Sequence, residues 1–138
     1  MAKAHKKIRV LICNKHTLFR EGIKALLEKG TPIEIVGEAN TASDAIQQLE
    51  RLRPDVVLMD VATTDLTGFE ATQRIKAIDP EVKVLILSLY EDETLMSRCM
   101  EAGAAGYLRN DEHASHLQTA IHAVCRTGEY RNDRAEAA

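Results

Sequence analysis

Residues 53–60 read RPDVVLMD, and the apolar run at 56–59 decides the fold class. Four consecutive apolar residues indicate a strand covered on both faces, because a strand with one wet face alternates apolar and polar residues. Pro54 interrupts the preceding helical pattern, and the run ends abruptly at Asp60. Such a strand is typical of a parallel sheet with helices on both sides.

The alternation of apolar strands and amphipathic helices extends over most of the chain. Strands are predicted at 8–13, 33–39, 56–59, 82–87 and around 107–108. Helices are predicted from 18 up to Gly30, and at 41–53, 69–78, 91–102 and 112–126. Parallel neighbours need a crossover connection, and here each crossover is helical. We therefore predict one doubly wound α/β domain over 8–128, with an N-terminal tail at 1–7 and a C-terminal tail or linker start at 129–138.

Composition narrows the classes of function. The 138 residues, 45% of them hydrophobic, suit one compact domain. A formal net charge of -3 supplies no strong field for phosphates, so direct nucleic-acid binding by this segment is not expected. No apolar stretch approaches the ~20 residues that cross a bilayer. Cys13, Cys99 and Cys125 lack the spacing of metal or redox motifs and are predicted to be buried, reduced thiols, which favours a cytoplasmic location.

The residues that close each predicted strand are the candidates for a functional site, because ligands of open parallel sheets collect beyond the carboxyl ends of the strands. An ionised carboxylate is costly to bury without a partner, so Asp60 is the main candidate, with a helix cap or turn residue as the alternative. The segment CNKHTLF (13–19) after the first strand has no glycine-rich loop, which disfavours a nucleotide-binding or enzymatic domain. The candidates are Asn14, Lys15, Asp60, Ser88, Arg109 and Asn110.

Six segments carry a family resemblance: LFREGIKALLE (18–28), RPDVVLMD (53–60), GFEATQRIKA (68–77), VLILS (84–88), EAGAAGYLRND (101–111) and LQTAIHAV (117–124). Together they resemble response-regulator receiver domains (CheY-like), particularly those of LuxR/NarL-type two-component regulators. The resemblance implies a flavodoxin-like, five-stranded parallel sheet with five helices and the strand order 2-1-3-4-5. In this family an acidic pair after the first strand and an acceptor Asp hold Mg²⁺, and a histidine kinase passes a phosphoryl group to that Asp.

Three positions of the family pattern keep their groups. The resemblance places the phosphoacceptor at Asp60, the switch hydroxyl at Ser88, and the aromatic residue that reports activation at Tyr107. Ser88 and Tyr107 are either vestiges of a switch or still move between two arrangements that a protein partner biases.

Three other positions have lost their groups. The acidic pair falls on Asn14 and Lys15, and the phosphate-reading Lys falls on Asn110. Because Mg²⁺ is held mainly by carboxylate oxygens, we expect no Mg²⁺ binding and no other cofactor. The Lys15 ammonium is hypothesised to replace the metal as a counter-ion beside Asp60; the alternative is a solvated side chain that points outward.

The sequence therefore predicts an atypical receiver domain without enzymatic activity, which signals through protein contacts and not through Mg²⁺-dependent aspartyl phosphorylation. The alternative is a working phosphoacceptor, phosphorylated on Asp60 by a histidine kinase. Expected partners are proteins: a second copy in a homodimer, a kinase, or a C-terminal effector domain of a transcriptional regulator, with no membrane contact.

Overall fold

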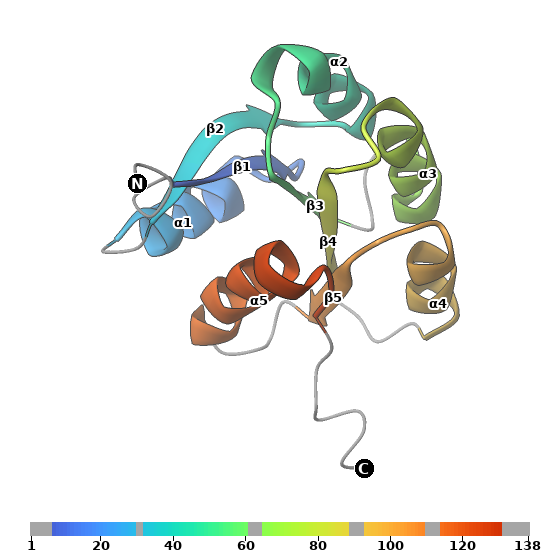
Figure 1. Ribbon diagram of the computed structural model, residues 1–138. Coiled ribbons are helices and arrows are strands. Elements are labelled where there is room, and N and C mark those ends of the chain that lie inside the picture. Colours follow the sequence, from blue (N-terminus) through green and yellow to red (C-terminus); the bar gives the residue numbers. More distant parts are fainter. Residues whose placement is uncertain (1–6, 30–31, 61–64, 89–92, 110–113, 131–138) are drawn as a thin grey trace.

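The computed structural model describes residues 7–29, 32–60, 65–88, 93–109 and 114–130. Within them, one parallel sheet has the order β2-β1-β3-β4-β5 and helices on both faces (Figure 1). The strands are β1 (Ile8–Cys13), β2 (Ile33–Ala39), β3 (Val56–Asp60), β4 (Lys83–Ser88) and β5 (Gly106–Arg109). The helices are α1 (Thr17–Glu28), α2 (Ala42–Leu52), α3 (Gly68–Ile78), α4 (Glu93–Glu101) and α5 (Ala114–Thr127). The predicted fold class and strand order are confirmed.

Two apolar layers sandwich the sheet, which explains why its strands are apolar on both faces. In β3, Val57 and Met59 belong to the layer covered by α2, α3 and α4. Val56 and Leu58, which alternate with them, belong to the layer covered by α1 and α5. This period of two is that of an extended chain, and the two groups of helices lie on opposite sides of the sheet (Figure 1).

Local capping sets the ends of two helices that the sequence predicted. The Thr41 hydroxyl accepts a hydrogen bond from the Asp44 N–H at 3.1 Å, and so begins α2. Arg53 ends this helix in the left-handed region, at φ 49°. Helix α3 begins with a capping box, in which the Thr67 hydroxyl and the Glu70 carboxylate each accept a hydrogen bond from the other residue's N–H.

The C-terminal part differs in detail from the prediction. Residues 91 and 112, where the last two helices were expected to begin, lie outside the described residues. The first residues of the expected linker pack onto the domain: the Tyr130 N–H donates to the Ala105 carbonyl at 2.8 Å, and Tyr130 forms a parallel bridge with Gly106. The sheet edge at β5 is therefore extended by a residue that the sequence assigned to a tail.

The prediction of buried thiols holds for two of the three cysteines. Cys13 and Cys99 are buried, whereas Cys125 is exposed, so the expectation is wrong there. Cys125 follows the buried Val124 on α5, and the rotation of about 100° per helical residue carries its side chain out of the buried stripe. None of the described helices combines the length and apolarity needed to cross a membrane.

Candidate functional site

The sheet topology brings the ends of three neighbouring strands to one edge. Asn14 follows β1, Asp60 ends β3 and Ser88 ends β4, and these strands are adjacent in the sheet. All three side chains are almost fully buried, at 2%, 8% and 3% exposure. Asp60 pairs in register with Leu87, the residue before Ser88, so the carboxylate and the hydroxyl close adjacent strands.

Asn14 contacts Asp60 directly. Its amide Nδ2 donates to Asp60 Oδ2 at 3.2 Å. The other end of the amide is fixed as well, since Oδ1 accepts the His16 N–H at 2.7 Å. Because an amide presents its donor and acceptor on opposite sides, engaging the oxygen with the turn directs the NH₂ group toward the carboxylate. A neutral donor therefore lies where the family carries a carboxylate.

Lys15 does not act as the hypothesised counter-ion in this structure. Its side chain is exposed. Among the described residues, no ion pair joins the Lys15 ammonium to Asp60. The alternative, a solvated side chain that points outward, is the arrangement observed.

The two switch positions lie on the strands beside Asp60. Ser88 is buried and pairs in register with Arg109 of β5. Tyr107 pairs with Ile86 and packs, half-buried, against the layer covered by α2, α3 and α4. The predicted lysine position, Asn110, lies outside the described residues.

The residues present do not match what a Mg²⁺ site requires. Mg²⁺ prefers hard oxygen ligands at near-octahedral geometry, usually including one or two carboxylates. Asp60 is the one carboxylate among Asn14, Lys15 and Asp60, the Asn14 oxygen is engaged by a backbone N–H, and an ammonium cannot be a ligand. In the part of the chain that the structure describes, no cluster of three or more His, Cys, Asp or Glu side chains is arranged to hold a metal ion.

The Cys13 thiol beside this site stays protonated at neutral pH. Burial raises its pKa to about 12, and the negative charges of Asp60, Asp65 and Asp44 act in the same direction. Nucleophilic or metal-binding chemistry requires the thiolate. Cys13 is therefore a neutral core residue at neutral pH, which agrees with the predicted reduced thiol.

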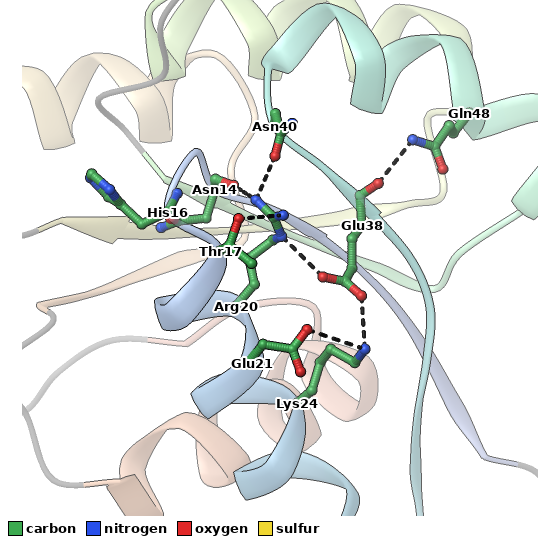
Figure 2. A network of polar contacts seen from close by, with 9 residues as sticks. All are labelled: Asn14, His16, Thr17, Arg20, Glu21, Lys24, Glu38, Asn40 and Gln48. Atoms are coloured by element: carbon green, nitrogen blue, oxygen red, sulfur yellow. Dashed lines mark hydrogen bonds and ion pairs between the residues drawn. The ribbon is translucent and has the colours of Figure 1, made fainter.

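An ion-pair network beside the site was not predicted from the sequence. Arg20 on α1 donates through Nε to Glu38 Oε1 of β2 at 3.0 Å, and Lys24 donates to Glu38 Oε2 at 2.8 Å (Figure 2). The available signal was helical spacing, since Arg20 falls on the buried side of α1 with Ile23 and Leu27.

A second unpredicted contact fixes the segment that leads into α3. The Asp65 carboxylate accepts the Ala42 N–H at 3.1 Å and the Ser43 N–H at 3.2 Å, at the N-terminus of α2. Hydrogen bonds from Ser43, and then from the Ala42 N–H, hold the pKa of Asp65 below its usual range. The favourable position of a carboxylate at a helix N-terminus explains this arrangement.

A doubly wound sheet of this strand order, with a nearly buried aspartate ending its middle strand and a hydroxyl ending the next, is the arrangement that the resemblance to receiver domains implies. The family model for the response regulator receiver domain matches residues 10–122. The chain belongs to this family, and it is the receiver domain of a two-component response regulator.

Similar proteins agree with this assignment. The chain is 36% identical over 124 residues to the transcriptional regulatory protein DegU of Brevibacillus brevis, covering 90% of this chain and 52% of that protein. It is 37% identical over 117 residues to the response regulator UvrY of Escherichia coli (strain K12), covering 85% and 54%. The chain thus spans about half the length of these curated relatives.

Solved structures show the same fold. A two-component response regulator of the LuxR family from Aurantimonas sp. SI85-9A1 matches with a TM-score of 0.88 and 28% identity, covering 96% of this chain and 94% of that one. The signal receiver domain of the putative response regulator NarL from Mycobacterium tuberculosis matches with a TM-score of 0.84 and 25% identity, covering 88% and 98%.

Proposed function

We propose that this chain is an atypical receiver domain that transmits signals through protein contacts and does not depend on Mg²⁺-dependent phosphorylation of Asp60. The observation that carries the proposal is the hydrogen bond from Asn14 Nδ2 to Asp60 Oδ2, made by a side chain with 2% exposure. It provides the carboxylate with a neutral donor in place of a metal ion.

Electrostatics supports the loss of the metal. At about 4 Å and an effective dielectric of about 20, a dication and a carboxylate attract by roughly 8 kcal/mol. A micromolar site is worth about 8 kcal/mol in total. Replacing one carboxylate by Asn14 and the other by the cationic Lys15 therefore removes more attraction than such a site has to lose. We infer that the domain takes no Mg²⁺ and no other cofactor.

Phosphoryl transfer to Asp60 would also lose its main assistance. In the family, the metal and a lysine neutralise charge on the phosphoryl oxygens, and the lysine position is Asn110 here. An amide contributes hydrogen bonds but no positive charge. The role of Asp60 is therefore to accept a hydrogen bond, and not a phosphoryl group. The domain itself catalyses no reaction.

The alternative is a phosphoacceptor that still works on Asp60. The buried Ser88, which closes the strand beside Asp60, favours this reading because the family hydroxyl position is retained. The two readings differ in whether a small phosphodonor modifies the protein.

The partners proposed are proteins. The match to this chain covers about half of each curated relative, and these relatives are named as response or transcriptional regulators, so we propose that this chain is the regulatory part of such a regulator in the cytoplasm. A second copy, a histidine kinase or a C-terminal effector domain are the candidate partners.

The proposal is tested by incubating the protein with acetyl phosphate, with and without Mg²⁺, and measuring the intact mass. We expect no metal-dependent gain of one phosphoryl group. A gain that requires Mg²⁺ and disappears in Asp60→Asn would establish the alternative.

A further inference from the structure

The buried guanidinium of Arg20 connects α1 to the ends of two strands at the candidate site. Its exposure is 9%. It donates to the backbone carbonyl of Asn14, to Asn40 Oδ1 at 2.6 Å, to Glu38 Oε1 at 3.0 Å and to Thr17 Oγ1 at 3.4 Å (Figure 2). These contacts fix the turn after β1 against the end of β2, which lies beside it in the sheet.

The Glu38 carboxylate provides the negative charge that compensates the buried guanidinium of Arg20. Its carboxylate accepts from Arg20 through Oε1 and from Lys24 through Oε2, so both oxygens are engaged. Its backbone carbonyl accepts from Gln48 Nε2 of α2 at 3.1 Å. Lys24 is half-buried and also lies 3.9 Å from Glu21, on the same helix. The acceptor of the Arg20 ion pair is therefore held from both α1 and α2.

Hydrogen bonds to the backbone and to Oδ1 of Asn14 set the orientation of its side chain. Its N–H donates to the Ala39 carbonyl at 3.0 Å, and its carbonyl accepts from Arg20. Its Oδ1 accepts from the His16 N–H, which leaves Nδ2 directed at Asp60. Ala39 and His16 contact Asn14 through backbone atoms, whereas Arg20 contacts it through a side chain that comes from α1.

We propose that Arg20 is the positioning residue of the pocket: by holding the Asn14 carbonyl, it orients the Asn14 amide so that Nδ2 donates to Asp60. The proposal deepens the proposed function, and rests on it in that the Asn14–Asp60 pair stands in place of the metal. A lysine could not substitute, because one ammonium on a flexible stem lacks the planar fork that reaches the Asn14 carbonyl, Asn40 and Glu38 together.

The test compares Arg20→Met with Lys24→Met in ¹⁵N-labelled protein, following the side-chain NH₂ signals of Asn14 by NMR. Both substitutions remove a cation from Glu38, but only Arg20 also contacts Asn14. Loss of a hydrogen bond worth about 1 kcal/mol corresponds to about fivefold faster exchange of the Asn14 amide protons in Arg20→Met. Lys24→Met should leave the exchange rate and the chemical shifts of these protons unchanged.

Two further variants keep the proposal open to refutation if Arg20→Met does not fold. Arg20→Lys should reproduce the faster exchange, and Glu38→Gln, which retains the guanidinium, should give a smaller increase. Unchanged Asn14 signals in folded Arg20→Met or Arg20→Lys would overturn the proposal, as would an equal change in Lys24→Met. Mg²⁺-dependent phosphorylation of Asp60 in the wild-type chain by acetyl phosphate would refute the proposed function while leaving this NMR result intact, so the two failures are distinguishable.

Discussion

Asn14 and Asp60 are joined across neighbouring parallel strands by a hydrogen bond between a side-chain amide and a buried carboxylate, 3.2 Å from Nδ2 to Oδ2. Their strands pair in register, with Cys13 opposite Met59, so the next residue of each strand meets its counterpart at the sheet edge. A buried carboxylate needs donors, and this amide is one that needs no metal.

Truncating Asn14 should destabilise the fold. Asn14→Ala removes one donor from Asp60 and the acceptor of the His16 N–H, and leaving buried polar groups unsatisfied costs about 1–3 kcal/mol. Urea unfolding measures the loss in the free energy of unfolding. Lys15→Ala is the matched control, because an exposed side chain of this kind contributes less than about 0.5 kcal/mol. An equally large loss in the control would restore Lys15 as a counter-ion of Asp60.

Restoring the acidic pair should make stability depend on Mg²⁺. Asn14→Asp with Lys15→Asp places new carboxylates beside Asp60, and like charges at a shared site repel. Without metal, the free energy of unfolding of the double variant should be at least about 1 kcal/mol lower than that of the wild type. Millimolar Mg²⁺ should recover this loss by binding the folded state. Thermal unfolding with and without MgCl₂ measures the effect. If the melting temperature of the variant does not change with Mg²⁺, these positions do not form the metal site.

Stability should decline in acid, partly through Glu38. The hydrogen bond from Lys24, reinforced by that from Arg20, holds the pKa of Glu38 below its ordinary value of 4.5. The unfolded chain therefore takes up this proton first, so the contribution of Glu38 is present above about pH 4.5 and is lost as the pH falls through the folded-state pKa. In urea unfolding, the stability gap between wild type and Glu38→Gln should narrow from about pH 6 to about pH 3. Glu34→Gln, at an exposed position of β2, is the control variant.

The contact between Gly106 and Tyr130 should tolerate no side chain at position 106. A Cβ there would lie 2.5 Å from the Tyr130 carbonyl oxygen, which is backbone and cannot move alone. Gly106→Ala should therefore release Tyr130 from the sheet edge and speed hydrogen exchange of its amide. Gly22→Ala is the control, because a Cβ at Gly22 meets nothing within 4 Å and a helical alanine stabilises by up to about 1 kcal/mol. Unchanged Tyr130 exchange in Gly106→Ala would contradict this account.

Much of the fold was predictable because its signals are local. Strands β1 and β2 were predicted to the residue, and Thr41 and Arg53 bounded α2 as predicted. The meeting of Asn14 and Asp60 followed from topology, since parallel strands end at one edge of the sheet.

The unpredicted contacts join residues far apart in sequence. Arg20 and Glu38 are 18 residues apart, and Asp65 lies 23 residues from the Ala42 N–H that it accepts. Helical periodicity places Arg20 on a buried face but does not predict which residue forms its ion pair. Tyr130 was assigned to a polar tail because a single bridge has no periodic pattern to reveal it.

Isothermal titration of the wild-type protein with MgCl₂ near neutral pH tests the central claim most directly, with the Asn14→Asp, Lys15→Asp double variant as the positive control. We predict no saturable heat for the wild type at low millimolar metal and a saturable isotherm for the double variant. Saturable Mg²⁺ binding by the wild type, abolished in Asp60→Asn, would contradict the claim that the Asn14 amide has taken the place of the metal.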